Sequence, residues 1–307
     1  MSDELNNLVE GLQQPHKSIS PKYFYDENGS KLFEQITRLP EYYLTNTELY
    51  IMRAHVDEIA ALVGPKASLI EFGSGSSLKT RLLLEHLEDI AVYVPVDISE
   101  EHLLESQMSI KDEFPEVEVL PVVADFTRRF DLPNPKVDPL RNLVYFPGST
   151  IGNFEYEDAI GLLRVMYQEA GADGALLIGI DLQKDPEVIN AAYNDTAGVT
   201  ARFNLNVLSH LNREFDAEFD VDAFEHRANY DEDEGRVSME LVSERDQVVS
   251  IGGERIDIAK GEAILTEYSH KYTLDGFAAM AKEADFVVSK VWTDPERRFG
   301  VLYCTRD

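Results

Sequence analysis

The sequence has a single cysteine, Cys304, and no apolar run close to the roughly 20 residues that a membrane-spanning helix needs. One cysteine excludes a framework of intrachain disulfides and cannot supply a zinc site of several cysteines. The first segment, MSDELNNLVEGLQQ, is too polar to act as a signal peptide. We therefore expect a cytoplasmic protein with no membrane partner.

Basic residues are also scarce. The 307-residue chain has 28 Lys and Arg against 57 Asp and Glu, which gives a formal net charge of −29. Binding to a phosphate backbone requires a cluster of Lys and Arg, and the sequence contains none. This charge argues against a nucleic-acid partner, and the repulsion between acidic surfaces favours a monomer.

Several catalytic and metal-binding motifs are missing. The sequence has no G-x-S-x-G elbow for a nucleophilic serine, and its seven histidines show no H-E-x-x-H spacing. The acidic segment from Asp231 to Gly235 lacks the ligand order of a calcium loop, so it is predicted to be the tip of a hairpin. We expect no bound metal.

The stretch that organises the chain is SLIEFGSGSSLKT, from Ser68 to Thr80. An apolar run ends at Glu71, a Gly-Ser-Gly-Ser-Ser turn follows, and a helical pattern begins at Lys79. In open α/β sheets such a turn lets the backbone approach a ligand closely. The E-x-G-x-G spacing differs from the dinucleotide and triphosphate motifs and favours an S-adenosylmethionine site. The alternative is an ordinary strand-to-helix turn.

Strands and helices alternate through the first two thirds of the chain. This order predicts an α/β fold with a mostly parallel, Rossmann-like doubly wound sheet that has helices on both faces. The expected strands are 69–71, 91–99, 117–127, 141–147 and 175–182, and the expected helices are 47–63, 79–87, 100–114 and 155–170.

The alternation stops after Asp181. A helical stretch over 186–215 and several strand-like segments with antiparallel character follow, and the α/β pattern resumes at Leu274. We read the intervening block as an insertion that forms a second, α+β domain with the N-terminal segment. The predicted domains are 47–184 plus 273–307, and 1–46 plus 185–272.

Acidic residues end three successive strands of the predicted sheet. Asp97 follows the glycine turn by about two dozen residues, where a carboxylate accepts hydrogen bonds from ribose hydroxyls in nucleoside sites. Asp125 and Phe126 could provide an acceptor and a ring for adenine. Each aspartate alone could equally be a solvated strand end or a helix cap, but their joint position favours a nucleoside ligand.

The N-terminal segment up to Glu48 is dense in aromatic residues. Such rings usually pack in a core. The pairs Phe24-Tyr25 and Tyr42-Tyr43 nevertheless adjoin loop residues, where a phenol could face a ligand.

Six long segments carry a family resemblance: FYDENGSKLFEQITRLPEYYLTNTE, EFGSGSSLKTRLLL, YVPVDIS, FPGSTIGNF, AAYNDTAGVTARFNLNVL and TEYSHKY. From about Tyr23 to its end, the chain closely resembles the histidine-specific S-adenosylmethionine-dependent methyltransferases of ergothioneine biosynthesis, the L-histidine Nα-methyltransferases. The resemblance implies a class I methyltransferase domain, a second substrate-binding domain, S-adenosyl-L-methionine as cofactor, and stepwise methylation of a small amino acid, L-histidine, to its trimethylated betaine, hercynine.

The resemblance also implies a role for individual residues. Cofactor contacts are expected from Gly73, Lys79, Asp97, Asp125 and Phe126. The substrate carboxylate is expected at Asn153 and Tyr193, the amino group near the catalytic pair Tyr25 and Tyr42, and the imidazole among Met239, Glu267 and Ser269.

These roles agree with the chemistry of the side chains. Neutral imidazole has one N–H donor and one acceptor, which Glu267 and Ser269 can satisfy, and tyrosine faces tolerate a quaternary cation. Related branches of the family methylate other amino acids, including prenylated tryptophan. An N-methyltransferase for another aromatic amino acid and a non-catalytic S-adenosylmethionine-binding scaffold therefore remain alternatives, although Met239, Glu267 and Ser269 favour histidine.

Overall fold

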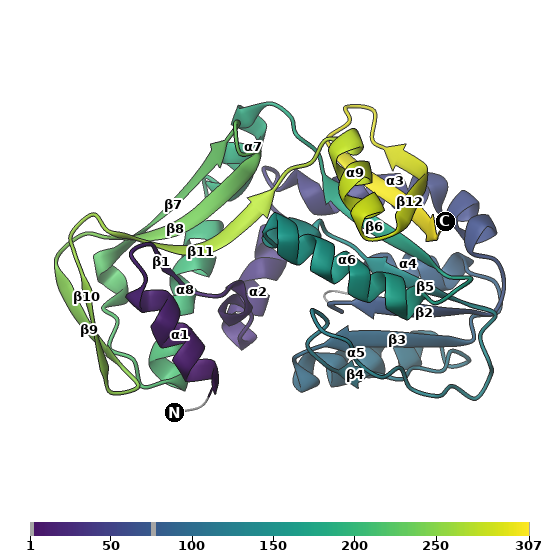
Figure 1. Cartoon of the computed structure of the whole chain (residues 1–307), viewed down its shortest axis with the longest axis horizontal. Coiled ribbons are helices and arrows are strands. Elements are labelled where there is room, and N and C mark those ends of the chain that lie inside the picture. The colour runs from purple at the N-terminus through teal and green to yellow at the C-terminus, as the bar shows by residue number, and fades with distance from the viewer. Residues whose placement is uncertain (1–2, 75–77, 307) are drawn as a thin grey trace. The chain divides into compact units, whose positions relative to one another are not determined.

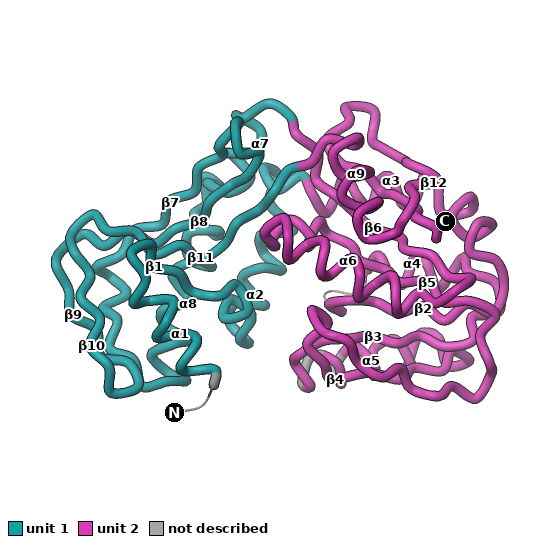
Figure 2. The backbone as a smooth tube through the Cα atoms, in the orientation of Figure 1, with its two compact units in different colours: residues 1–43, 184–271 teal, residues 44–183, 272–307 magenta. Residues whose placement is uncertain are grey.

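The computed structural model describes residues 3–74 and 78–306, and the chain divides into two compact units (Figure 2). Unit 1 consists of residues 1–43 and 184–271, and unit 2 of residues 44–183 and 272–307. The first division falls three residues before the predicted position. Helix α3 (Tyr43–Val63) likewise begins four residues before its predicted start at Thr47. In the described part of the chain, no helix is long and apolar enough to cross a membrane.

Among the described residues, unit 2 is built on a seven-stranded sheet with the order β12-β13-β6-β5-β2-β3-β4 (Figure 1). The strands from β6 to β4 run parallel, whereas β13 pairs antiparallel with β6 and β12. The predicted doubly wound sheet is confirmed. Its strands are β2 (Ala67–Phe72), β3 (Val92–Asp97), β4 (Val122–Val123), β5 (Arg141–Phe146), β6 (Ala175–Asp181), β12 (Phe286–Thr293) and β13 (Phe299–Arg306).

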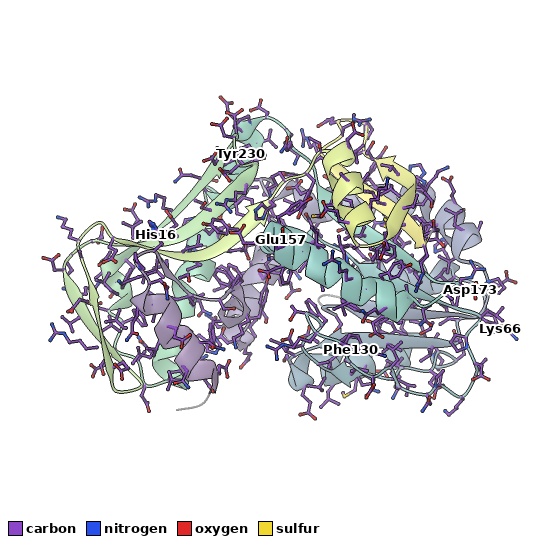
Figure 3. All side chains as sticks on the ribbon, viewed as in Figure 1. His16, Lys66, Phe130, Glu157, Asp173 and Tyr230 are labelled. Atoms are coloured by element: carbon purple, nitrogen blue, oxygen red, sulfur yellow. The ribbon has the colours of Figure 1, made fainter. Side chains whose placement is uncertain are left out.

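Helices cover this sheet. In Figure 1, α6 and α9 lie in front of the sheet, and α3 and α4 lie behind it. All residues of β2 and β6 are buried, which explains why β6 reads as an apolar run up to Asp181. The Phe130 ring, labelled in Figure 3, lies 5.5 Å from the Phe72 ring at the end of β2. The remaining helices of unit 2 are α4 (Leu78–His86), α5 (Glu100–Glu113), α6 (Tyr156–Ala170) and α9 (Leu274–Glu283).

One strand of the sheet is shorter than the sequence predicts. The predicted strand 117–127 is reduced to β4 and a single bridge between Tyr93 and Val119. Pro121 separates the two, and it has no N–H to donate to the ladder. Asp125 therefore lies in a loop beyond β4, where its carboxylate accepts the N–H of Thr127 at 3.0 Å.

Unit 1 contains a four-stranded sheet with the order β1-β11-β8-β7 and a separate hairpin of β9 and β10. The turn between β7 and β8 is a hairpin tip, as predicted, and Asp231 Oδ1 accepts the N–H groups of Asp233 and Glu234. Tyr230 stands beside this turn (Figure 3). The strands are β1 (Lys17–Ser18), β7 (Phe224–Asp231), β8 (Arg236–Ser243), β9 (Gln247–Ile251), β10 (Glu254–Ile258) and β11 (Ala263–His270).

The helical stretch predicted over 186–215 is two helices. The helical conformation is interrupted between them. Asp195 caps the second helix by accepting the N–H groups of Val199 and Thr200. Gly198 has a φ of +66°, which residues with a side chain rarely adopt. The helices of unit 1 are α1 (Asp3–Gln13), α2 (Glu27–Ile36), α7 (Pro186–Tyr193) and α8 (Val199–Glu214), and short 3₁₀ turns are η1 (Pro21–Phe24) and η3 (Val221–Ala223).

A buried acid lies inside the central strand of unit 2. Glu71 is 3% exposed, and its carboxyl group accepts hydrogen bonds from the Thr80 hydroxyl at 2.7 Å and the Tyr93 hydroxyl at 2.5 Å. Burial raises the pKa of Glu71 to about 7, although the two hydrogen bonds act in the opposite direction. The folded state therefore holds a proton that the unfolded chain releases near pH 4.5.

We expect Glu71 to make folding less favourable as the pH rises from 5 to 8. The stabilisation that comes from this raised pKa is fully present below 4.5, the pKa of the Glu71 carboxyl group in the unfolded chain. It is lost as the pH rises through about 7, the pKa in the folded chain. Relative to Glu71→Gln, which does not titrate, the free energy of unfolding of the wild type should decrease by on the order of 2 to 3 kcal/mol over this range. Denaturant melts at both pH values test this, with Glu225→Gln, at an exposed position, as control. A wild-type to Glu71→Gln difference that does not change with pH would refute it.

Candidate active site

The carboxyl end of β2 lies at the centre of the unit 2 sheet, beside β3 and β5. Gly73 has a φ of +75°, and its N–H donates to the Val96 carbonyl at 2.8 Å. A side chain at Gly73 would approach the Phe126 ring at 3.7 Å and would be strained by this backbone conformation. The rest of the predicted glycine turn, residues 75–77, lies outside the described residues.

Asp97 and Asp125, two of the three acids predicted at strand ends, come after this turn in the chain. Asp97 is the last residue of β3 and is half-buried, and one of its oxygens accepts the Ser99 N–H at 3.0 Å. Asp125 is exposed in its loop, and Phe126 beside it lies 5.6 Å from Phe72 and 5.8 Å from Phe146, measured between ring centres. The structure therefore holds Phe126 at the edge of the core, beside Gly73.

The sequence analysis missed an ion pair next to this turn. Glu48 of α3 is 1% exposed, and its carboxylate binds the Lys79 ammonium and accepts the Gly148 N–H at 2.9 Å. A side chain at Gly179 on β6 would overlap the same carboxylate. The only signal in the sequence was an acid within an apolar helix, which alone does not identify its partners. In the structure Glu48 holds Lys79 and the loop after β5 together.

The loop after β5 carries the candidate Asn153. It forms the 3₁₀ turn η2 (Thr150–Asn153), which Ser149 precedes with a φ of +59°. The Ser149 hydroxyl accepts the Asp181 N–H at 2.8 Å, so the loop is attached to the end of β6 as well as to Glu48. Asn153 keeps part of its surface exposed at the end of this fixed loop.

The residues around this turn fit a nucleoside cofactor that carries an amino-acid tail. The Ser74 hydroxyl is buried and has no hydrogen-bond partner among the described residues, so it can bind a polar ligand group. Asp97 supplies carboxylate oxygens suited to ribose hydroxyls, and the Phe126 ring offers a face for a base. Lys79 adds a cation whose position Glu48 fixes.

In unit 1, four predicted substrate residues meet on β8, β11 and α7. The Tyr193 hydroxyl donates to Ser269 Oγ at 2.7 Å, and Met239 faces Glu267 across the β8 and β11 ladder. Tyr193, Ser269 and Met239 are buried, and Glu267 keeps part of its surface exposed. Strand β11 therefore carries a partly exposed carboxyl group, Glu267, and a buried hydroxyl two residues further on, Ser269.

The carboxyl group of Glu267 has an unusual pKa. Enclosure by protein raises its pKa to about 7, while the positive charge of Lys271 acts in the opposite direction. Tyr268, the residue between Glu267 and Ser269, faces the other side of the strand, because the Arg236 guanidinium lies 3.9 Å above its ring. A substitution of that ring would therefore leave the Glu267 side of β11 in place.

Tyr25 and Tyr42 belong to one aromatic group of unit 1. Both rings lie next to the Phe33 ring, at 5.8 Å for Tyr25 and 6.3 Å for Tyr42 between centres, and Tyr25 also lies 5.9 Å from Phe203 of α8. Tyr25 is 41% exposed and Tyr42 is half-buried. The two motifs FYD and EYY, 17 residues apart in the sequence, therefore contribute a tyrosine each to one aromatic group around Phe33.

A buried polar network behind Tyr193 was not predicted. The Asn204 amide of α8 lies 2.9 Å from a ring nitrogen of His226 and accepts the Thr266 hydroxyl at 2.7 Å. The other ring nitrogen of His226 lies 2.9 Å from the Tyr193 carbonyl. These bonds connect α7, α8, β7 and β11, so they fix the backbone that carries Tyr193.

The chain is similar to known methyltransferases along its whole length. A family model described as histidine-specific, SAM-dependent methyltransferase matches residues 4–306. A histidine N-alpha-methyltransferase of Mycolicibacterium smegmatis is 41% identical over 96% of this chain and 92% of that protein. Ergothioneine biosynthesis protein 1 of Schizosaccharomyces pombe is 30% identical over 92% of this chain and 38% of that protein.

A solved structure agrees with the fold. An S-adenosylmethionine-dependent methyltransferase from Clostridium acetobutylicum superposes with a TM-score of 0.52 and 10% identity, over 90% of this chain and 98% of that chain. The predicted class I methyltransferase fold and the family resemblance are therefore confirmed. The chain belongs to the family of histidine-specific, S-adenosylmethionine-dependent methyltransferases.

Proposed function

We propose that this enzyme methylates the α-amino nitrogen of L-histidine three times, giving Nα,Nα,Nα-trimethylhistidine (hercynine), a step of ergothioneine biosynthesis. The observation that carries this proposal is the group formed by Glu267, Ser269 and Tyr193. A carboxyl group can accept the N–H of an imidazole ring, and a hydroxyl can donate to the other ring nitrogen. The name of the mycobacterial relative supports the same substrate.

The cofactor residues belong to unit 2. When bound, S-adenosyl-L-methionine supplies an electrophilic methyl group on a sulfonium. Asp97 would accept hydrogen bonds from the ribose, Asp125 would accept one from the adenine amine, and Phe126 would cover the base. Gly73 leaves room for close approach, and Lys79 would bind the negatively charged end of the amino-acid tail.

The substrate residues divide by the group they would hold. Glu267 would accept the imidazole N–H, and Ser269 would donate to the other ring nitrogen. Met239 would pack against the ring. Asn153 would bind the carboxylate through its amide donor, and Tyr193, predicted for the same group, would lie beside it with its own hydroxyl hydrogen bonded to Ser269 Oγ.

The amine side of the substrate faces a different requirement. The α-ammonium must lose its proton before it can attack a methyl group, and each transfer releases one proton and S-adenosylhomocysteine. We propose that Tyr25 and Tyr42 position the amine, because their phenols can hold an ordered water and their faces can accept a growing cation. Holding the amine in line is the main contribution of the protein.

Incubation with histidine and S-adenosylmethionine tests the reaction. We expect mass spectrometry of the small-molecule fraction to detect a product heavier than histidine by three methyl groups. A panel with tryptophan, tyrosine, phenylalanine and a prenylated tryptophan measures specificity. Transfer to one of these in place of histidine would identify a different aromatic substrate, and no transfer together with no S-adenosylhomocysteine binding would contradict an enzyme.

Replacing Glu267 with alanine tests the imidazole site. Because a charged hydrogen bond contributes about 1.5 to 3 kcal/mol, kcat/KM for histidine should fall roughly 10- to 100-fold. Calorimetric affinity for S-adenosylhomocysteine should not change. Glu225→Gln, at an exposed position on the same sheet, serves as the control. Unchanged histidine kinetics in Glu267→Ala would remove Glu267 from the site.

A pair of substitutions at Tyr25 separates the ring from the hydroxyl. Tyr25→Leu should lose the cation–π contact, which contributes about 0.5 to 2 kcal/mol. Mono- and dimethylhistidine should then accumulate, because formation of the quaternary ammonium in the last transfer depends most on this contact. Tyr25→Phe should keep full trimethylation with a slower first transfer. Tyr50→Leu, at another exposed tyrosine, controls for loss of a surface ring. Wild-type product ratios in Tyr25→Leu would contradict a role for the ring.

A further inference from the structure

Lys271 is a buried cation beside the proposed imidazole site. It is 3% exposed, and its Nζ donates to the Tyr193 hydroxyl and to Ser269 Oγ, each at 2.8 Å. Its backbone N–H donates to the Gly235 carbonyl at 2.7 Å, which holds it against the turn between β7 and β8. Glu267, Ser269 and Lys271 are spaced two residues apart, as residues on one face of an extended strand are.

Lys271 determines the direction of the hydrogen bonds around it. An ammonium group can only donate, so the oxygens of Tyr193 and Ser269 both act as acceptors toward it. The Tyr193 hydroxyl in turn donates its hydrogen to Ser269 Oγ at 2.7 Å. Ser269 Oγ therefore accepts two hydrogen bonds, and a hydroxyl oxygen has two lone pairs. Its own hydrogen remains as a donor.

We propose that Lys271 is a positioning residue for substrate specificity, which fixes Ser269 as a donor toward a bare ring nitrogen while Glu267 accepts the N–H of the same ring. The inference rests on the proposed function. The site then recognises neutral imidazole in one orientation. A ring with no acceptor nitrogen, such as phenyl, leaves the Ser269 hydrogen without a partner, which a buried site penalises.

The positive charge of Lys271 also favours the ionised, hydrogen-bond-accepting form of Glu267. Burial favours the protonated form of Glu267 and raises its pKa to about 7, and the nearby ammonium favours the carboxylate. A carboxylate can only accept hydrogen bonds, whereas a protonated carboxyl group can also donate. Lys271 thus fixes Ser269 as a donor through hydrogen bonds and favours the acceptor form of Glu267 through its charge.

A double-mutant cycle between Lys271 and Ser269 tests the proposal. Lys271→Met keeps the length of the side chain and removes its charge and donors. With Ser269 present, kcat/KM for histidine should fall roughly 10- to 100-fold, mainly through KM, because charged hydrogen bonds are lost. In the Ser269→Ala background the same substitution should cost less than about threefold, because the partner that it orients is absent.

Controls separate positioning from folding. Lys260→Met removes an exposed lysine that precedes β11 and should leave the kinetics unchanged. Lys271→Arg keeps the charge and should recover part of the histidine KM. Affinity for S-adenosylhomocysteine and melting temperature report on the intact fold. Where Lys271→Met does not fold, Lys271→Gln, which keeps an amide donor and lacks the charge, replaces it in the cycle.

Two results would overturn the proposal. Equal losses with and without Ser269 would mean that Lys271 does not act through Ser269, and unchanged KM in Lys271→Met would mean that it does not orient the site. Failure of the underlying function is a separate result: wild type would then not methylate histidine at all, and the Lys271 proposal would fall with it.

Discussion

The hydrogen-bonded ion pair between Glu48 and Lys79 is the interaction on which the geometry of unit 2 depends. One buried carboxylate connects helix α3, the start of α4 and the loop after β5, and it occupies space that the absent side chain of Gly179 leaves open. A buried carboxylate is stable only when its oxygens are bonded, so these three segments cannot move independently. The candidate cofactor residue Lys79 and the loop that carries Asn153 therefore have fixed positions.

In unit 1, buried polar groups also have to be hydrogen-bonded, but here they are a neutral amide and an ammonium group. Asn204 of α8 is fully buried and bonds to β7, β8 and β11 through one amide, and Lys271 bonds to Tyr193 and Ser269 through one ammonium. Each group has a fixed number of donors and acceptors, so satisfying them defines the direction of every bond. An apolar core of equal volume would hold the same strands but would leave the orientation of the hydroxyls undefined.

The fold was predictable where local patterns carry it. Alternating strands and helices, Asp97 at the end of β3 and the hairpin tip at Asp231 all follow from residues within one or two elements. The prediction was wrong for the strand 117–127, where Pro121 removes a donor, and it did not divide the helical stretch 186–215, where Asp195 caps a new start. Both errors came from a single residue within a favourable pattern, which a periodicity analysis averages out.

The candidate site was only partly predictable. The family resemblance supplied Glu267, Ser269 and Tyr193, but not Lys271 or Glu48. Glu48 lies 31 residues from Lys79 and 100 from Gly148, and Lys271 lies 78 residues from Tyr193. No spacing rule links residues so far apart, and a lysine two positions after a serine has no distinctive pattern. Such partners become visible only when the strands and helices are folded together.

Among the described residues, Glu71 and Glu267 have a raised pKa of about 7, but their surroundings differ. Glu71 has both oxygens bonded to core hydroxyls and is 3% exposed, so a ligand could reach it only by breaking those bonds. Glu267 keeps exposed surface, and Ser269, which accepts the Tyr193 hydroxyl, lies two residues further along the same strand. A perturbed pKa therefore identifies burial, and only the accessibility and the partners of the group distinguish an acid that binds substrate from one that completes a core.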